Sequence, residues 1–201
     1  MELDHLAISA ASLDEGVAFV EDAFGVKLAP GGVHDAMGTH NRLLSPGHGL
    51  YLEVIAIDPE RRDPGRARWF DLDRFTGAPR LTNWIVRCND IAAAGEVFPD
   101  PGQVMHLARG DLAWDMAVPD SGVTPFGGMA PALIRWHGTA HPAARLPEAA
   151  CRLRALTVAS PRADALRAAL GDLQGPVAFV TSDCSVLTAV FDTPRGPLTL
   201  G

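Results

Sequence analysis

Two side chains in the first sixty residues, His5 and Glu53, are of types that bind divalent metal ions or exchange protons. Each stands in a short apolar segment that is typical of a β-strand, residues 3–9 and 49–56. Successive side chains of a strand point to opposite faces. The aliphatic residues expected on the face away from His5 and Glu53 are Leu6, Ile8, Leu52 and Val54. If those residues pack under a helix, the imidazole and the carboxylate project together from the other face. There they could bind a metal, form a buried ion pair or touch a substrate directly.

The elements that would position this pair form a β-α-β-β-β unit in residues 1–58. Ser12 and Glu15 have the spacing of a capping box, which opens a helix. Apolar residues then recur every three or four positions, as on one side of a helix, and Gly25 is placed to end it. Two more strands are expected in residues 26–44, before the strand that carries Glu53.

A strand followed by a helix recurs near residues 81 and 153, which suggests an internal repeat. The predicted organisation is one compact domain with the segments 1–58, 59–80, 81–138 and 150–201. The first and third segments are βαβββ modules, and residues 59–80 are a connector. The last segment is a βαβ-type repeat that either completes the second module or packs on its flank. The connector is read as a solvated linker, although its arginines could attract an anionic substrate group.

Composition and motifs exclude several classes of function. The chain of 201 residues has a net charge of −7 and no basic face, which argues against binding to nucleic acid or anionic membranes. It has no apolar run long enough to span a membrane and no visible signal peptide, so a cytoplasmic protein is expected. Three widely separated cysteines are read as reduced thiols. The absence of phosphate-loop, dinucleotide and nucleophile–base motifs predicts no nucleotide cofactor.

Several short segments together resemble the glyoxalase-like branch of the vicinal oxygen chelate superfamily. These segments are Asp4-His5-Leu6, Gly38-Thr39-His40-Asn41, Tyr51-Leu52-Glu53, Trp114, Pro125-Phe126-Gly127-Gly128, Trp136 and His141-Pro142-Ala143. The resemblance implies an α+β fold in which βαβββ modules form a curled mixed sheet around a cup for a small ligand. In metal-dependent members each module supplies one ligand from its first strand and one from its last, and His5 and Glu53 match those two positions.

The second module departs from this pattern, because Trp84 aligns with His5 and residues 132–136 contain no carboxylate or imidazole. A metal would need a third protein ligand, for which His40 is the first candidate. The resemblance therefore implies a centre of His5, His40 and Glu53 that holds Zn, Ni, Mn or Fe, with Glu53 or His40 moving a proton. The substitutes for His40 are His34 and His106.

Aromatic residues are the candidates for substrate binding, with core packing as the alternative for each. They are Tyr51, Trp84, Trp114, Phe126 and Trp136, and His141 could reach the mouth of the cup. Arg109 and Arg135 could clamp a carboxylate or form surface pairs. The leading hypothesis is a metal-assisted lyase, isomerase or dioxygenase acting on a small substrate with vicinal oxygens. The alternative is a metal-free protein that sequesters a small molecule. A homodimer is expected from the resemblance alone.

Overall fold

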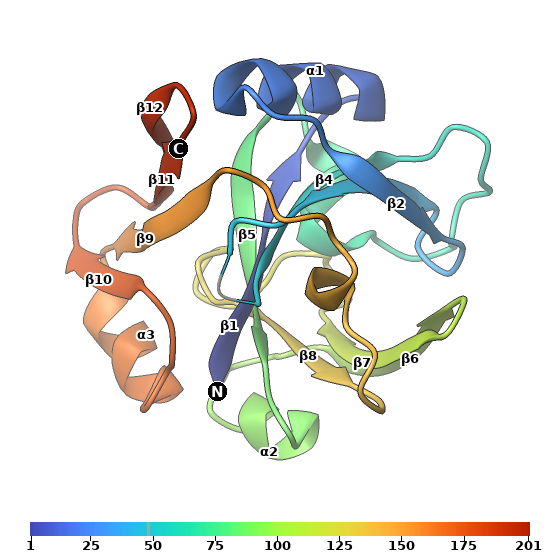
Figure 1. Cartoon of the computed structure of the whole chain (residues 1–201). Coiled ribbons are helices and arrows are strands. Elements are labelled where there is room, and N and C mark those ends of the chain that lie inside the picture. The colour runs from blue at the N-terminus through green and yellow to red at the C-terminus, as the bar shows by residue number, and fades with distance from the viewer. Residues whose placement is uncertain (48) are drawn as a thin grey trace.

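A computed structural model describes residues 1–47 and 49–201 (Figure 1). Its two sheets are an eight-stranded mixed sheet, in the order β2-β3-β4-β1-β5-β8-β7-β6, and a four-stranded sheet, in the order β10-β9-β11-β12. The α+β fold with a curled mixed sheet, predicted from the sequence, is confirmed. No helix in the described part of the chain has the length and apolar character needed to cross a membrane.

The first half of the large sheet is a βαβββ unit. Its elements are β1 (Glu2–Ser9), α1 (Leu13–Phe24), β2 (Ala29–His34), β3 (Thr39–Leu44) and β4 (Tyr51–Ile57). β4 returns to pair with β1 in parallel, so the strands that carry His5 and Glu53 are neighbours. In their register His5 lies beside Tyr51, and Ala7 lies beside Glu53.

Helix α1 begins and ends where the sequence predicts. The Ser12 hydroxyl accepts a hydrogen bond from the Glu15 N–H at 3.3 Å, and this bond caps the first turn. Gly25 has φ 69°, the left-handed conformation that a residue without a side chain adopts at no steric cost. The residues buried between the helix and the sheet include Leu13, Val20 and Phe24.

The second half of the large sheet repeats this arrangement. Its elements are β5 (Arg80–Arg87), α2 (Ile91–Gly95), β6 (Gln103–Arg109), β7 (Leu112–Val118) and β8 (Ala132–Trp136). β8 pairs in parallel with β5, as β4 does with β1, and the two halves meet where β1 and β5 run antiparallel. The sheet curls so that its two edge strands, β2 and β6, come into contact on the same side of the molecule (Figure 1).

The third unit forms the small sheet. Its elements are β9 (Arg152–Ser160), α3 (Ala163–Leu170), β10 (Val177–Thr181), β11 (Val186–Thr193) and β12 (Gly196–Leu200). Here β9 pairs in parallel with β10 and antiparallel with β11, an order unlike that of the first two units. Helix α3 begins after Arg162, two residues later than the predicted Ser160-Pro161 cap.

The small sheet packs on the flank of the large one. The Phe191 ring meets Phe24 of α1 edge-on at 4.9 Å between centroids, and Phe179 lies 6.1 Å from Trp84 of β5. In Figure 1 the orange and red strands accordingly lie to one side of the blue and green ones. The third unit therefore covers the outer face of the large sheet and contributes no strand to the cup.

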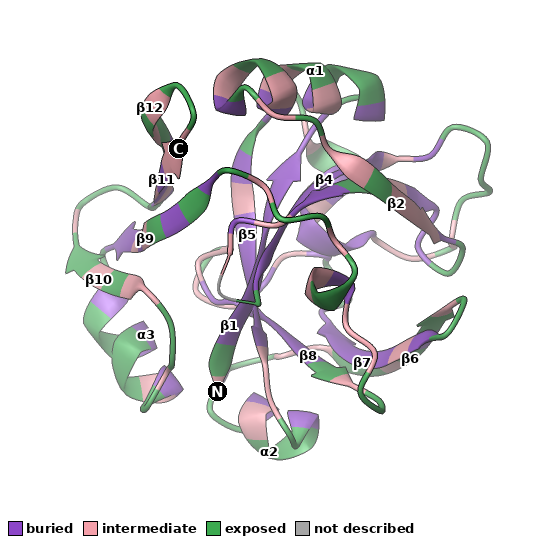
Figure 2. Ribbon diagram, viewed as in Figure 1, coloured by how far each residue is buried: buried purple, intermediate pink, exposed green. Residues whose placement is uncertain are grey.

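The large sheet separates two apolar clusters, and its central strands are buried (Figure 2). The outer cluster contains the aliphatic residues that the alternation predicts, Leu6, Ile8, Leu52 and Val54. The inner cluster contains Ala7 and Ile55, and it continues into the aromatic wall of the cup. The predicted division of strands β1 and β4 into two faces is thus observed.

Candidate functional site

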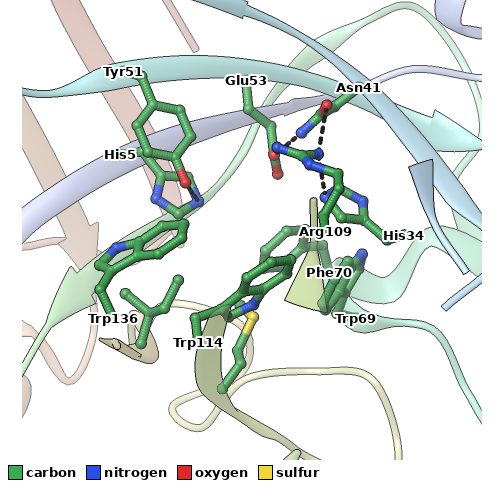
Figure 3. Close-up of a pocket in the computed structure, with 12 residues that line it drawn as sticks. His5, His34, Asn41, Tyr51, Glu53, Trp69, Phe70, Arg109, Trp114 and Trp136 are labelled. Atoms are coloured by element: carbon green, nitrogen blue, oxygen red, sulfur yellow. Dashed lines mark hydrogen bonds between the residues drawn. The ribbon is translucent and has the colours of Figure 1, made fainter. Parts of the chain in front are cut away.

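The concave face of the large sheet holds a narrow pocket lined by residues from both βαβββ units and from the segment between them (Figure 3). The lining residues are His5, His34, Asn41, Tyr51, Glu53, Trp69, Phe70, Arg109, Trp114, Met116, Ile134 and Trp136. The cavity inside this pocket is small, about 30 Å³. A ligand of more than a few atoms must therefore displace a side chain.

A buried carboxylate, Asp4, orients His5 from behind. Asp4 Oδ1 lies 2.6 Å from His5 Nδ1, and Asp4 Oδ2 is 3.1 Å from both Trp136 Nε1 and His141 Nε2. Burial would raise the pKa of Asp4, but the hydrogen bonds from His141 and His5 hold this pKa well below its usual range. Asp4 is therefore an anion inside the protein, and three donors converge on it.

The Asp4 contact determines which side of the His5 ring faces the pocket. A neutral His5 donates its Nδ1–H to Asp4, so its Nε2 can accept a hydrogen bond from another group. Tyr51 stacks on this ring at 4.1 Å between centroids, and its hydroxyl lies 3.3 Å from Nε2. Burial and the charges of Asp4 and Glu53 raise the pKa of Tyr51 well above its ordinary value, so the phenol remains protonated and can donate to Nε2.

Glu53 is held from the neighbouring strand by an amide whose orientation is fixed. Asn41 Nδ2 donates to Glu53 Oε2 at 2.8 Å. Asn41 Oδ1 accepts from the Gly32 N–H at 2.8 Å and from Arg109 Nη1 at 3.3 Å, so its oxygen and nitrogen cannot be exchanged without loss. This leaves the second carboxylate oxygen of Glu53 available to the pocket.

Arg109 brings a positive charge to the same pocket from the opposite edge of the sheet. Its Nη1 donates to His34 Nε2 at 3.1 Å. Burial and the Arg109 charge lower the pKa of His34 to about 3, so this imidazole is neutral and accepts the bond. Arg109 passes over Gly32 of β2, where a Cβ atom would lie 2.6 Å from Arg109 Cδ. The missing side chain at Gly32 thus lets the arginine close the cup.

The structure brings most of the predicted residues together. His5, Tyr51, Glu53, Trp114 and Trp136 all line the pocket. His141 lies behind it, with its ring centroid 5.8 Å from that of Tyr51 and 5.1 Å from that of Trp136. His141 therefore supports the site through Asp4 and does not line it.

His40 is not in the cup. In the β3–β4 register it lies beside Ala56, whereas its neighbour Asn41 lies beside Ile55 and lines the pocket. Because side chains alternate along a strand, His40 points to the other face, where its Nδ1 is 3.9 Å from Asp58. The expected grouping of His5, His40 and Glu53 does not form.

Trp84 and Phe126 also lie outside the pocket. Trp84 pairs with Leu6 and shares its face, so it is fully buried in the outer core, where its Nε1–H donates to the Met129 carbonyl at 2.9 Å. Phe126 packs on the outer cluster, and the Arg162 guanidinium lies 4.3 Å from its ring centroid. For both residues the core alternative holds.

The segment between the first two units is not a simple solvated linker. Its 3₁₀ helix η1 (Trp69–Arg74) buries Trp69 and Phe70, and both rings line the pocket. Arg68 is buried as well, and its guanidinium pairs with Asp73 at 2.5 Å. Two large aromatic residues inside a polar connector were the sequence signal for this role.

The side chains that line the cup do not supply the three metal ligands expected from the sequence. Two imidazoles and one carboxylate line it, but both His34 nitrogens are engaged, by Arg109 and by Thr39 Oγ1 at 3.1 Å. Among the described residues, three potential ligands converge elsewhere: His106, Asp115 and His137 have ligand atoms within 4.8 Å of one another. Of the two substitutes for His40, His34 thus lies in the cup and His106 outside it.

Comparison with known proteins places the chain in a family. Residues 3–173 match the model of the glyoxalase-like domain, and the chain belongs to this family. A structure of a hypothetical protein from Staphylococcus aureus is 16% identical, with a TM-score of 0.61, and the alignment covers 92% of this chain and 87% of that one. Methylmalonyl-CoA epimerase from Mycobacterium tuberculosis is 20% identical, with a TM-score of 0.44 and coverage of 69% and 88%. No curated protein matches the chain. At 16% identity the likeness to the Staphylococcus aureus structure is one of fold.

Proposed function

We propose that this protein is an enzyme that moves a proton at the carbon next to a carbonyl group of a small anionic substrate. This is the chemistry of isomerases, epimerases and some lyases. The observation that supports it best is that a carboxylate-oriented imidazole, His5, and a second carboxylate, Glu53, line one pocket together with a guanidinium. Perturbed and convergent ionisable groups in a cleft are typical of catalytic sites.

In this proposal His5 is the base. The Asp4 carboxylate holds the ring through Nδ1 at 2.6 Å, which aims Nε2 at the pocket and stabilises the imidazolium that forms when Nε2 takes a proton. The Tyr51 hydroxyl lies 3.3 Å from Nε2. In the proposal this hydroxyl either moves away when the substrate binds or donates a proton back to the substrate. A positioned acid or base of this kind contributes roughly 10²- to 10⁴-fold to a rate.

Glu53 and Arg109 have complementary roles. Asn41 engages one Glu53 oxygen, so the other can give or take a proton on the face of the substrate opposite His5. Arg109 would bind a substrate carboxylate or stabilise the negative charge of an enolate oxygen. The walls of Trp69, Trp114 and Trp136 exclude water, and this strengthens the charge interactions within the pocket.

Substrate access requires a side chain to move, and Phe70 is placed to do so. It lines the cup and also a neighbouring pocket with a volume of about 330 Å³. Phe70 and Asp71 both have positive φ, 61° and 57°, which side-chain-bearing residues rarely adopt. Such conformations cost roughly 1–3 kcal/mol each and are common where a segment switches position.

The proposal assigns no step to a metal in the cup, because the ligand set found there does not support a three-ligand centre. Ring-cleaving dioxygenase chemistry, which relies on such a centre, is for the same reason not proposed. A second function is sequestration of an apolar small molecule. The tryptophan walls of the pocket favour it, and so does the small number of side chains there that are free to bind a metal. The two functions differ in one observable, which is turnover of the bound molecule.

The test begins with a thermal-shift screen of small 2-oxo, 2-hydroxy and malonate-type acids, followed by NMR of each ligand during incubation. The proposal expects the native protein to convert at least one of these bound acids into a product, at whatever rate. It also expects a loss of about 100-fold or more in His5→Gln and in Glu53→Gln. Asp111→Asn, an exposed carboxylate on the β6–β7 turn, is the matched control and retains full activity. Tight binding without conversion would favour sequestration and contradict the enzyme.

A further inference from the structure

We infer that His106, Asp115 and His137 form a binding site for one divalent transition-metal ion, of the kind that imidazole favours, such as Zn²⁺ or Co²⁺. The site lies on the outer face of the second unit and is separate from the cup. His106 of β6 pairs directly with Asp115 of β7, and His137 follows the last residue of β8. Two adjacent strands thus contribute one ligand each, and the third ligand comes from the residue that follows β8. This inference is independent of the proposed function.

The face on which the site lies follows from strand alternation. Trp114 and Met116, on either side of Asp115, line the cup, so Asp115 points away from it. The Asp115 side chain is only 5% exposed, whereas His106 and His137 are 83% and 43% exposed. The arrangement is a buried carboxylate under two solvent-facing imidazoles, with open positions for water on the ion.

The distances suit a small ion. Asp115 Oδ1 lies 2.5 Å from His106 Nδ1 and 2.9 Å from His137 Nε2. Ligand bonds of about 2.0–2.1 Å in a tetrahedron put neighbouring ligand atoms about 3.3 Å apart. The distance from Asp115 Oδ1 must therefore widen from 2.5 Å to His106 and from 2.9 Å to His137, to about 3.3 Å in each case. Rotation of the exposed His106 ring and a smaller shift of His137 provide this. Both imidazoles already point a nitrogen at one carboxylate oxygen, which is the convergence that a metal site needs.

The backbone around the cluster is fixed, so the ligands are held in advance. The β6–β7 hairpin is paired along its whole length, from Gln103 with Val118 to Arg109 with Leu112. The His137 N–H donates to the Ala113 carbonyl at 2.9 Å, which ties the residue to β7 beyond the end of β8. Sites on paired strands lose little conformational freedom on binding.

An ion here would fasten together the strands that carry part of the aromatic wall of the cup. Asp115 follows Trp114 in the chain, and His137 follows Trp136. The two indole rings lie 5.5 Å apart between centroids on the cup side. An ion bound by Asp115 and His137 would therefore link the two chain segments that carry this pair of indoles.

The test is titration of metal-free protein with Zn²⁺ by calorimetry and with Co²⁺ by visible absorption. The native protein is expected to bind one ion. His106→Ala and His137→Ala each weaken binding at least about tenfold, by analogy with the loss of supporting groups at metal sites. The double variant loses it. His40→Ala, which removes a histidine outside both sites, keeps native binding and is the matched control.

Both histidines are solvent-facing, so the double variant is expected to keep the native circular dichroism spectrum and serves as the decisive variant. A Zn²⁺-dependent rise in the unfolding temperature of the native protein, absent from the double variant, would be a second supporting result. Failure of the native protein to bind either ion would overturn the inference. Unchanged stoichiometric binding in the double variant would also overturn it, as would a loss confined to His5→Gln.

Discussion

Replacing Asp4 by asparagine tests the arrangement behind His5. The carboxylate accepts from His5, His141 and Trp136, at 2.6, 3.1 and 3.1 Å, and none of its surface is exposed. An asparagine of the same shape has one acceptor oxygen, and it turns an N–H₂ group toward donors. At least one buried donor then loses its partner, and the remaining bonds lose their charge.

The expected cost follows from the chemistry of buried pairs. Hydrogen bonds to a charged group contribute about 1.5–3 kcal/mol each, and breaking a buried charged pair on one side costs about 3–5 kcal/mol. We expect Asp4→Asn to lower the free energy of unfolding at pH 7 by about 3–5 kcal/mol. Urea denaturation, followed by tryptophan fluorescence and by circular dichroism, measures this difference.

The pH dependence provides an internal check on the cause. Because the pKa of Asp4 is lowered in the folded protein, its stabilisation is present above the unfolded value of 3.8 and is lost as the pH falls toward the folded value. The difference between the native protein and the variant should therefore shrink as the pH falls below about 4. The Asp111→Asn control should show a much smaller change, because the ion pair of Asp111 with Arg145 is exposed to solvent. A cost below about 1 kcal/mol for Asp4→Asn would refute the reasoning.

Two further predictions concern His34 and the third unit. Burial lowers the pKa of His34 to about 3, so below its unfolded value of 6.5 the unfolded chain gains a proton that the folded protein does not. Between pH 7.5 and pH 5 this proton uptake should lower the free energy of unfolding by about 2 kcal/mol. Urea titrations should show that the His34→Gln variant lacks this part of the pH dependence. Phe191→Ala, which deletes the ring packed on Phe24, should destabilise by about 3–5 kcal/mol within one calorimetric transition. If the third unit of the variant melted in a separate transition while the large sheet melted as in the native protein, the two would not share a core.

The regular strands were predictable from the sequence, and so were the residues that regular alternation controls. His5, Tyr51 and Glu53 share a face because β1 and β4 pair in parallel without interruption from residue 5 onward. The capping pattern located α1 to the residue, because its signals are local. At each of the three places where the sequence repeats a strand and a helix, the structure has such a pair: β1 and α1, β5 and α2, and β9 and α3.

The errors arose where register or long-range packing decides. A bulge between Leu3 and His5 sets β5 so that Ile85, and not Trp84, lies beside His5. The residue at which β3 begins decides which of its side chains face the cup. Thr39 and Asn41 are on that face and His40 is on the other, and no local feature of the sequence determines this choice. Asp4 was visible beside His5, but its role depends on donors more than 130 residues away.

The cluster of His106, Asp115 and His137 shows how much a turn can specify. The two-residue turn at Gly110-Asp111 sets Arg109 beside Leu112, and counting outward from there puts His106 beside Asp115. The pairing of His106 with Asp115 could therefore be predicted from the sequence once the hairpin was recognised. His137 was not, because its position depends on the pairing of β8 with β7 across a long connection.

The central claim is that His5 moves a proton in the cup, and solvent isotope incorporation tests it most directly. A ligand identified in the acid screen is incubated with enzyme in D₂O, and deuterium at the carbon next to its carbonyl group is followed by NMR. We predict incorporation by the native protein and a rate at least about 100-fold lower in His5→Gln, with Asp111→Asn unchanged. Equal incorporation by the native protein and His5→Gln, or none by the native protein with the ligand bound in the cup, would contradict the account.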